Sequence, residues 1–521
     1  MTEVKTEIKK PTPTRSTPVK EVSHWDIETD VVIVGFGGAG SCAAIEAANA
    51  GAEVHLFEVS SAAGGSTALS GGEVYLGGSG GTAMQKKFGF EDTTENLVNY
   101  LMMQHAPQAD EEKIRRFAEG AAGHFDWLVE MGVPFKESYY EERVVEPTTD
   151  DCLFWCGNEK TWPEIEKCKP VPRGHVVQME GMGAGALLMQ VLEKAAVARG
   201  VNVHFDSRAL SLIVDEHEQV VGLMVRKDGK VLACKARGGV VLCAGGFVMN
   251  EKMVKQYAPR LNAANNPIGN PGDTGTGIQM GMSVGGAAIN MHEGFSSVPY
   301  YPPASLTYSI IVNGKGQRFV NEDAYHGRIG TRLLEQYREQ NNERIYMIAD
   351  VDAYGNYEEG SWLNADVVAT GETIEELEQE LGLPADSLSH TMNFYNQHAE
   401  AGEDPLFHKQ SQWLRPLQAP YVALDMTPGR GVYIPFFTLG GLDTLPSGEV
   451  KKLDGSIVPG LYAAGRTACG IPRRGDGYNS GISIADATFS GRQAGVAASQ
   501  RARSVAYAAQ GCVVGCSQGG D

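Results

Sequence analysis

The stretch TDVVIVGFGGAGSCAAIEAANAGAEVHLFE, residues 29–58, decides the fold. Its first part, DVVIVG, is a short apolar run rich in β-branched residues, which predicts a buried parallel strand. Small residues from about Gly38 to Ala50 predict a helix, and EVHLFE predicts a second strand that ends at Glu58. This order of elements is typical of a βαβ unit in an α/β fold.

The glycines between the first strand and the helix predict a dinucleotide site. Gly35, Gly37 and Gly40 form GxGxxG, which gives a tight turn, close approach of a diphosphate to the backbone, and close packing of helix on strand. The helix N-terminus suits phosphate, and Glu58 can accept hydrogen bonds from both ribose hydroxyls. A glycine-rich turn in an unrelated α/β unit is the alternative, but strand, helix, strand and acid in this order favour the nucleotide.

Three later glycine-rich segments favour FAD over NAD. SSAAGGSTALSGG (60–72) follows the acidic residue directly, and a nicotinamide dehydrogenase has no need of a second glycine pair there. GGVVLCAGGF (238–247) and GLYAAGRTACG (460–470) each read as a buried strand that ends in glycine. These segments resemble the loops of flavoproteins that return to the cofactor.

Composition narrows the class of partner. A net charge of −20 disfavours nucleic acid and anionic membranes. No apolar run reaches the roughly 20 residues needed to span a bilayer. The nine cysteines are odd in number and lack CxxC spacing, which indicates a reducing, cytoplasmic location. Cys512 and Cys516 lie in a glycine-rich tail without a histidine, so we predict no metal site.

Taken together, the motifs resemble the fumarate reductase/succinate dehydrogenase flavoprotein superfamily, over about residues 29–500. GNPGDTGTGIQMGMSVGGAA (269–288), IVNGKGQRFVNED (311–323) and PFFTLGGLDT (435–444) are further matches. The resemblance implies a Rossmann-like FAD-binding domain interrupted by a smaller capping domain of α+β type. The expected division is a disordered tail at 1–28, FAD-binding segments at 29–289 and 425–502, a capping domain at 290–424, and a tail at 503–521.

The capping segment has its own patterns. SIIVNGKGQRFV predicts a hairpin with a Gly-Lys-Gly turn. RIGTRLLEQYREQ and ETIEELEQELG predict amphipathic helices, and RIYMIAD predicts a strand between them. Thr373 and Glu376 have the spacing of a capping box at the start of the second helix.

The motifs and the resemblance together assign the cofactor contacts. The predicted FAD-binding residues are Gly35, Gly37, Gly38, Ala39, Gly40, Glu58, Val59, Ser60, Gly64, Gly65, Ser66, Thr67, Ser70, Gly71, Gly72, Ala209, Ala244, Gly245, Gly246, Asn270, Asp273, Gly465, Arg466, Gly481, Ile482 and Ser483. Succinate dehydrogenases bind FAD through a histidine before the second glycine pair, and this loop has none. The FAD is therefore expected to be noncovalent.

A dicarboxylate reductase clamps two carboxylates with arginine and histidine. In place of those residues of the superfamily, this chain has Ala324-Tyr325-His326, Phe437 and Asp476. The cationic clamp is therefore predicted to be absent, and His326 is predicted to be structural. The neighbouring arginines, Arg328, Arg473 and Arg474, leave a shifted clamp, and with it reduction of an α,β-unsaturated acid, as an alternative.

The residues at these positions instead resemble the 3-ketosteroid Δ4-(5α)-dehydrogenases of this superfamily. Tyr325 follows RFVNED, and Tyr478 and Ser480 lie in GDGYNSGIS (475–483). The resemblance implies that Tyr478, helped by a glycine N–H, polarises the 3-keto oxygen. It implies that Ser480 takes the C4 proton, that Tyr325 relays it, and that flavin accepts the C5 hydride.

Other interpretations of these residues stay open. The Δ1-dehydrogenases carry a Tyr-Pro-Gly-Pro-Gly stretch where this chain has Tyr-Asn-Ser-Gly, so Δ1 chemistry ranks second. Each tyrosine can be a packed aromatic, and Ser480 can be a helix N-cap. A redox sensor or assembly subunit that binds FAD without turnover is a different class. The hydroxyl and aromatic residues that replace the clamp, with Tyr300-Tyr301 and Phe436-Phe437 nearby in motif terms, suit a hydrophobic small-molecule substrate with one or two oxygens. The chain has no CxxCH and no Fe–S pattern, so we expect an external electron acceptor.

Overall fold

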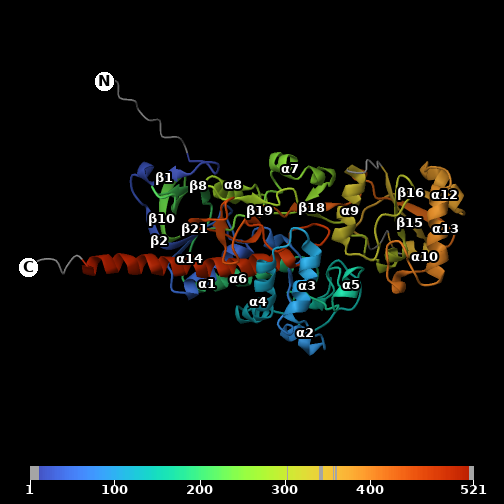
Figure 1. Cartoon of the computed structure of the whole chain (residues 1–521), viewed down its shortest axis with the longest axis horizontal. Helices are drawn as coiled ribbons and strands as arrows, with labels where there is room; N and C mark the ends of the chain where they lie inside the picture. Colours follow the sequence, from blue (N-terminus) through green and yellow to red (C-terminus); the bar gives the residue numbers. More distant parts are fainter. Residues whose placement is uncertain (1–10, 302, 339–343, 356, 358–360, 516–521) are drawn as a thin grey trace, which may run out of the picture.

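The computed structural model of the chain describes residues 11–515, except residues 302, 339–343, 356 and 358–360, and it omits the side chains of residues 508–515 (Figure 1). The molecule is elongated (Figure 1). A large sheet lies at one end, a smaller α+β lobe lies at the other, and the long C-terminal helix runs beside the large sheet. Cys512 and Cys516 therefore lie outside the described side chains.

A nine-stranded sheet forms the framework of the larger lobe. Its main path runs β1-β8-β9-β10-β2-β3-β7, and β21 joins β10 and carries β20. The strands are β1 Thr17–Pro18, β2 Ile27–Val34, β3 Val54–Phe57, β7 Asn202–His204, β8 Arg208–Val214, β9 Val220–Lys227, β10 Lys230–Leu242, β20 Glu449–Lys451 and β21 Ile457–Ala463. Helix α1, Gly38–Asn49, connects the parallel neighbours β2 and β3. The predicted βαβ unit is confirmed.

Strand β10 joins the antiparallel and parallel parts of this sheet. Its first half pairs with β9 in antiparallel register, and its second half pairs in parallel with β21. A bulge between Ala236 and Gly239 separates the two halves. Gly239 has φ +111°, and a Cβ there would lie 2.1 Å from the carbonyl oxygen of Gly460. Only glycine fits at this crossing, because backbone meets backbone there.

Helix α14, Ile482–Gly515, lies along α1 (Figure 1). A Cβ on Gly491 would lie 2.3 Å from the carbonyl oxygen of Ala39, and one on Gly495 would lie 2.2 Å from that of Ala43. Small residues on both helices therefore bring the two backbones into contact.

A helical lobe covers the lower side of the molecule in Figure 1, and the sequence patterns did not predict it. Its helices are α2 Ala83–Lys87, α3 Thr94–His105, α4 Glu111–Glu130 and α5 Glu164–Lys167; a small sheet adds β4 Glu73–Tyr75, β5 Leu153–Phe154 and β6 Gly174–Val176, and α6 Ala184–Ala198 packs on α1. The fully buried Arg173 makes two bonds to Asp92, with Nε–Oδ2 at 2.7 Å and Nη2–Oδ1 at 2.9 Å. This ion pair ties the small sheet to the loop before α3.

The smaller lobe is an antiparallel four-stranded sheet with helices packed on it. Its elements are β14 Ile310–Asn313, β15 Ile345–Asp350, β16 Val367–Gly371, β17 Tyr421–Asp425, α9 His326–Arg338, α10 Val351–Tyr354, α12 Ile374–Leu381 and α13 Ser387–Glu400. Both predicted helices and the predicted strand are present, and Thr373 and Glu376 form the predicted capping box. The predicted hairpin is shorter than expected, because its second arm reduces to one bridge between Val312 and Arg318.

Short elements connect the two lobes. They are α7 Glu251–Tyr257, α8 Thr276–Met282, β11 Asn266–Pro267, β12 Ala288–Ile289, β13 Gly294–Ser296, β18 Pro435–Thr438 and β19 Gly441–Leu442. Strand β18 pairs with both β11 and β13, so the chain leaves and re-enters the larger lobe side by side. We propose that the chain enters the capping domain near residue 290 and returns to the FAD-binding domain near residue 425, as the expected segments 290–424 and 425–502 imply.

The termini differ from the expected tails. Thr17 and Pro18 pair with β8, and β2 begins at Ile27, because this segment adds backbone hydrogen bonds to the sheet edge. Residues 1–10 lie outside the described part. At the other end α14 continues to Gly515, past the expected boundary at residue 502. Among the described residues, no helix combines the length and the apolar character needed to cross a bilayer.

The contact between α1 and α14 leads to a stability prediction. Gly495→Ala places a methyl group against the Ala43 carbonyl, so we expect the free energy of unfolding to fall by about 1–3 kcal/mol. Gly123→Ala in α4 is the matched control. Nothing lies within 4 Å of its added Cβ, so alanine stabilises the helix by roughly 0.5–1 kcal/mol. Denaturant unfolding of the FAD-loaded proteins measures both, and equal effects would contradict the packing argument.

Candidate active site

A cavity of about 650 Å³ extends along the carboxyl ends of β2, β10 and β21 and reaches the junction with the smaller lobe. Its walls come from the glycine-rich loops at one end and from aromatic residues of both lobes at the other. A volume of this size suits an organic ligand, since ligand pockets range over about 300–1,000 Å³.

The first end is shaped by the GxGxxG turn. Gly35 has φ +99°, and a Cβ on it would lie 2.4 Å from the Cys243 carbonyl oxygen. A Cβ on Gly40 would lie 1.9 Å from the carbonyl oxygen of Gly35. Gly37 and Gly38 line the cavity where α1 begins. The turn therefore delivers a helix N-terminus to the cavity wall, which suits a diphosphate.

Glu58 is fixed beside this turn. Its Oε2 accepts a hydrogen bond from the Phe36 N–H at 2.7 Å, and its Oε1 accepts one from the Ser60 N–H at 2.8 Å. The side chain is buried and lines the cavity. A carboxylate held by two backbone donors is ready to accept further hydrogen bonds from ribose hydroxyls.

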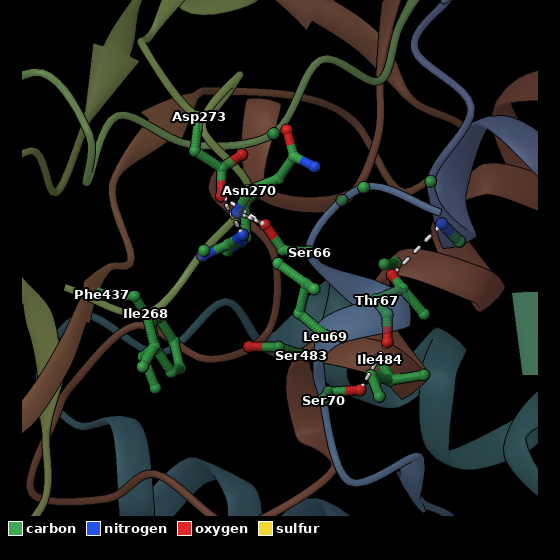
Figure 2. Close-up of a pocket in the computed structure, with 18 of the residues that line it drawn as sticks. Ser66, Thr67, Leu69, Ser70, Ile268, Asn270, Asp273, Phe437, Ser483 and Ile484 are labelled. Carbon is green, nitrogen blue, oxygen red and sulfur yellow. Dashed lines mark hydrogen bonds and ion pairs between the residues drawn. The ribbon is translucent and has the colours of Figure 1, made fainter. Parts of the chain in front are cut away.

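Polar contacts hold the middle of the cavity together (Figure 2). Ser66 donates to Asp273 at 2.5 Å and accepts from the N–H of Asn270 at 2.8 Å. Arg466 pairs with the same Asp273 carboxylate. Thr67 accepts a hydrogen bond at 3.2 Å from the N–H of Gly38 at the start of α1 (Figure 2). Segments far apart in sequence are thus joined around one space.

Most of the predicted cofactor residues line this cavity. Those that do are Gly35, Gly37, Gly38, Ala39, Glu58, Val59, Gly65, Ser66, Thr67, Ser70, Gly71, Ala209, Ala244, Gly245, Asn270, Asp273, Gly465, Arg466, Gly481 and Ser483. The structure places Gly40, Ser60, Gly64, Gly72, Gly246 and Ile482 behind the lining, next in sequence to residues that form it. Gly40, for example, supports the turn from below.

These residues fit FAD. The wall combines a helix N-terminus, an acceptor carboxylate that is held in place, and glycines at which an added Cβ would clash with neighbouring atoms. The cavity then continues to an aromatic end. Glu58 would hold the ribose, Gly37 and Gly38 the diphosphate, and the segment from Ser70 to Gly71 the ring system. When bound, FAD supplies the acceptor for a hydride.

The three predicted catalytic residues meet at the aromatic end. Tyr325, at the start of α9, and Ser480, just before α14, lie with their hydroxyl oxygens 2.7 Å apart. Tyr325 and Tyr478 are 3% and 6% exposed, and all three residues line the cavity. Ser480 therefore uses its hydroxyl for a contact between the lobes, not to cap the helix.

Tyr478 is held by an aromatic cluster. Its ring centroid lies 4.5 Å from that of Phe295 and 5.4 Å from that of Phe437. Its hydroxyl donates to Ser483 Oγ at 2.9 Å. Burial raises the pKa of Tyr478 to about 12 and raises the pKa of Tyr325 well above its usual value. Both hydroxyls thus keep their protons at neutral pH.

His326 also lines the cavity, beside Tyr325. The two rings lie 3.9 Å apart, and Nδ1 of His326 is 2.5 Å from Ser297 Oγ. Burial, and then the positive charge of Arg143, lower the pKa of His326 to about 3. The imidazole is neutral and packs against the tyrosine whose position it fixes.

The three arginines that could have formed a shifted carboxylate clamp, Arg328, Arg473 and Arg474, are all paired with carboxylates of the protein. Arg328 bonds to Glu164, Nη1–Oε2 at 3.2 Å, and Arg473 Nη2 bonds to Asp110 at 2.8 Å. Arg474 Nη2 bonds to Asp476 at 2.8 Å. None of the three arginines lines the cavity, whereas Phe437 does. Arg328 joins α9 to α5, and none of the three arginines forms a site for an anion at the cavity.

Sequence reasoning missed two acidic residues of the lining, Glu73 and Glu146. Glu73 opens an apolar strand directly after a glycine pair, and that position was a signal that could have been noticed. Glu146 lies in a loop without any motif, so only the folded chain brings it to the cavity. Among the described residues, no group of three or more His, Cys, Asp or Glu is arranged to hold a metal ion.

Comparison with known proteins identifies relatives along almost the whole chain. Residues 30–481 match the family described as FAD binding domain. The crystal structure of 3-ketosteroid-Δ4-(5α)-dehydrogenase from Rhodococcus jostii RHA1, in complex with 4-androstene-3,17-dione, is 41% identical with a TM-score of 0.87, covering 93% of this chain and 99% of that one.

Two further relatives are more distant. The 3-oxo-5-alpha-steroid 4-dehydrogenase of Comamonas testosteroni is 27% identical over 503 residues, 85% of this chain and 93% of its own. A probable fumarate reductase of Shewanella frigidimarina is 26% identical over 488 residues, 91% of this chain and 75% of its own. Both flavoprotein chemistries expected from the sequence are therefore represented among the relatives.

The fixed carboxylate of Glu58 leads to a binding prediction. Glu58→Ala removes the acceptor for the ribose, so we expect the affinity of the apoprotein for FAD to fall roughly ten- to hundredfold. Glu53→Ala removes an exposed acid nearby on the sheet and serves as the control. Titration of apoprotein with FAD, followed by flavin fluorescence, measures both, and an unchanged affinity for Glu58→Ala would rule out this ribose contact.

The loop from Gly64 to Ala68 contains no histidine. We therefore expect acid denaturation to release all of the flavin into the supernatant. Colour that stays with the precipitated protein would contradict noncovalent binding.

Proposed function

The chain belongs to the FAD binding domain family, and we propose that it is a dehydrogenase that introduces a C4–C5 double bond into 3-keto-5α-steroids. Its cofactor is FAD, and it is an oxidoreductase that acts on CH–CH bonds. The substrate, the position of the new double bond and the roles of individual residues are the proposal.

One observation carries the proposal: Tyr325, Ser480 and Tyr478 converge on one end of the cavity, with Tyr325 and Ser480 2.7 Å apart. The walls there are aromatic, formed by Phe295, Phe437 and Tyr478 itself. Such a site suits a large apolar molecule that carries a neutral oxygen. The R. jostii enzyme, whose structure contains 4-androstene-3,17-dione, supports this class of substrate.

The ketone must first be polarised, because a C–H next to an unassisted carbonyl is too weak an acid for a side chain to deprotonate. Tyr478 is the proposed donor. Its hydroxyl now donates to Ser483, at 2.9 Å. When a ketone oxygen arrives, Tyr478 turns its hydrogen to that oxygen, and Ser483 donates to Tyr478 instead. The raised pKa of Tyr478, about 12, keeps this donor protonated.

The C4 proton then passes to Ser480. A serine hydroxyl accepts a proton only if it releases its own, and Tyr325 Oη, at 2.7 Å, is the group that receives it. Tyr325 in turn releases its own hydroxyl proton toward solvent, so both hydroxyls end the step neutral. Tyr325 is buried between Ser480 and the His326 ring, so its hydroxyl stays in line. FAD supplies the hydride acceptor for C5. The external electron acceptor is part of the proposal and has no assigned site.

The alternative of reducing an α,β-unsaturated acid has less support. A dicarboxylate substrate needs free cations, and Arg328, Arg473 and Arg474 are each paired with an internal carboxylate away from the cavity. Among the described residues that line the cavity, the arginines are Arg208 and Arg466. Arg466 is paired with Asp273, and Arg208 follows Ser207, whose N–H bonds to the Glu58 carbonyl oxygen at the end of the cavity away from Tyr478.

The proposed roles lead to different outcomes for three variants. Tyr478→Phe removes the ketone donor and is expected to slow flavin reduction by 5α-androstane-3,17-dione about 10²- to 10³-fold. Ser480→Ala removes the proton acceptor and is expected to cost about 10²- to 10⁴-fold, and Tyr325→Phe interrupts the relay within the same range. Anaerobic stopped-flow of FAD-loaded protein measures each rate.

Tyr462→Phe is the matched control, because this tyrosine is buried in β21 and does not line the cavity. It is expected to react like the unmodified enzyme. Equal rates for all four variants would contradict the assigned roles.

Product analysis after one anaerobic turnover tests the position of the double bond. We expect 4-androstene-3,17-dione. A 1-ene product would favour the Δ1 reaction, and reoxidation of chemically reduced enzyme by fumarate would favour the reductase. Retained FAD that no ketosteroid reduces would favour a binding or sensing role.

A further inference from the structure

The cavity contains two carboxyl side chains that the proposed mechanism does not use. Glu73 is in β4, and Glu146 is in the loop before β5; they are 7% and 9% exposed, and both line the cavity. They converge on Gly71. A Cβ on Gly71 would lie 1.8 Å from Oε2 of Glu146 and 2.8 Å from Oε1 of Glu73. The two acids therefore form one local group, here called the acid pair.

The two acids disfavour each other's ionisation. Their oxygens meet beside Gly71 in a buried part of the wall, and two carboxylates so close together are not both readily charged. Burial, and then the charge of Glu73, raise the pKa of Glu146 to about 10. Glu146 therefore keeps its proton at neutral pH.

One atom of the pair is unsatisfied. Oε1 of Glu146 is buried and has no hydrogen-bond partner in the described part of the chain. A buried carboxyl oxygen without a partner is rare in folded proteins and calls for an explanation. Because Glu146 lines the cavity, a polar group of a bound molecule is the partner that this atom lacks.

The surroundings determine which molecule fits. Val145, next in sequence to Glu146, and Leu69, two residues before Gly71, line the same cavity, so the acid pair has apolar neighbours. The pair offers one donor and several acceptors to a hydroxyl or ketone oxygen. A carboxylate that enters beside the acid pair would meet two acidic side chains. Arg208 lines the same cavity, but it follows Ser207, whose N–H bonds to the Glu58 carbonyl oxygen at the first end.

We propose that Glu73 and Glu146 are specificity-determining residues, which hydrogen-bond a neutral oxygen of the substrate and exclude molecules that carry a carboxylate. This inference rests on the proposed steroid activity, and it adds to it that the substrates are uncharged. A cationic clamp would favour substrates that carry carboxylates, whereas the acid pair would favour uncharged substrates.

The test is binding to the FAD-loaded protein without turnover, followed by the change in flavin absorbance. The probes are 4-androstene-3,17-dione and 3-oxo-4-androstene-17β-carboxylate, which differ at one end by a charge. We expect the neutral steroid to bind at least about tenfold more tightly than the acid. The double variant Glu73→Gln with Glu146→Gln is expected to bring this ratio within about threefold, since it removes the charge and keeps the hydrogen bonds.

Three further variants complete the design. Glu146→Gln alone leaves the Glu73 carboxylate, so the ratio persists. Glu141→Gln removes an exposed charge from the same loop and also leaves the ratio unchanged. Replacing both acids by leucine removes the hydrogen bonds, so the neutral steroid is expected to bind at least about tenfold more weakly. A ratio that the double glutamine change does not alter, or unchanged binding to the leucine variant, would overturn the proposal.

A stability measurement tests the protonation of Glu146 separately. The pKa of Glu146 rises on folding from 4.5 to about 10, so folding takes up a proton and stability is lost as the pH rises through this window. Glutamine does not titrate. The melting temperature of Glu146→Gln relative to the unmodified protein should therefore be higher at pH 8 than at pH 5. A difference independent of pH would contradict a protonated Glu146.

The binding experiment also separates the two hypotheses. If neither steroid perturbs the flavin of the unmodified protein, the proposed steroid activity fails. If the neutral steroid binds and the acid pair has no effect on the ratio, only the specificity proposal fails.

Discussion

The structure depends on the approach of backbone to backbone where β2 turns into α1. A Cβ added to Gly40 would lie 1.9 Å from the carbonyl oxygen of Gly35. A Cβ added to Gly35 would lie 2.4 Å from the carbonyl oxygen of Cys243. Glycine at these positions lets α1 lie directly on β2 and β10. On the far side of α1, Gly491 brings α14 equally close to Ala39. Because glycines form the wall at the first end of the cavity, no side chain fills that space, and a ligand can approach the backbone closely.

The same compaction positions the chemical end of the site. Helix α14 starts just after Ser480, so its packing against α1 fixes where that serine points. Tyr325 directly precedes helix α9 of the smaller lobe, and its hydrogen bond of 2.7 Å to Ser480 joins the lobes at the cavity. A mechanism that needs both hydroxyls therefore needs both lobes in place. The pair of Arg328 in α9 with Glu164 in α5 adds to this junction.

Local patterns predicted much of this fold. The βαβ unit at 29–58, the capping box at Thr373 and the glycine-rich strand ends were recognisable because each depends on neighbours in sequence. The helical lobe between α2 and α5 was not predicted, because its helices are fixed by tertiary contacts such as the buried pair of Arg173 and Asp92. The ordered segment at Thr17 was missed for a similar reason, since a sheet edge far along the chain orders it.

The candidate site divides in the same way. Tyr325, Tyr478 and Ser480 could be found because they lie in recognisable motifs, although the sequence could not give the hydrogen bond between them. Glu146 could not be found, because its loop has no motif and its environment is created by Gly71 and Glu73. Whether an acidic side chain is protonated depends on the groups that surround it in the folded chain, and the spacing of residues in the sequence does not predict those groups.

Position-specific deuterium labelling of 5α-androstane-3,17-dione tests the central claim most directly. The account predicts that deuterium at C5 slows anaerobic loss of the visible flavin absorbance and is lost from the steroid, whereas deuterium at C1 does neither. Slowing by the C1 label with retention of the C5 label would contradict it, because hydride would then leave from the other side of the ketone.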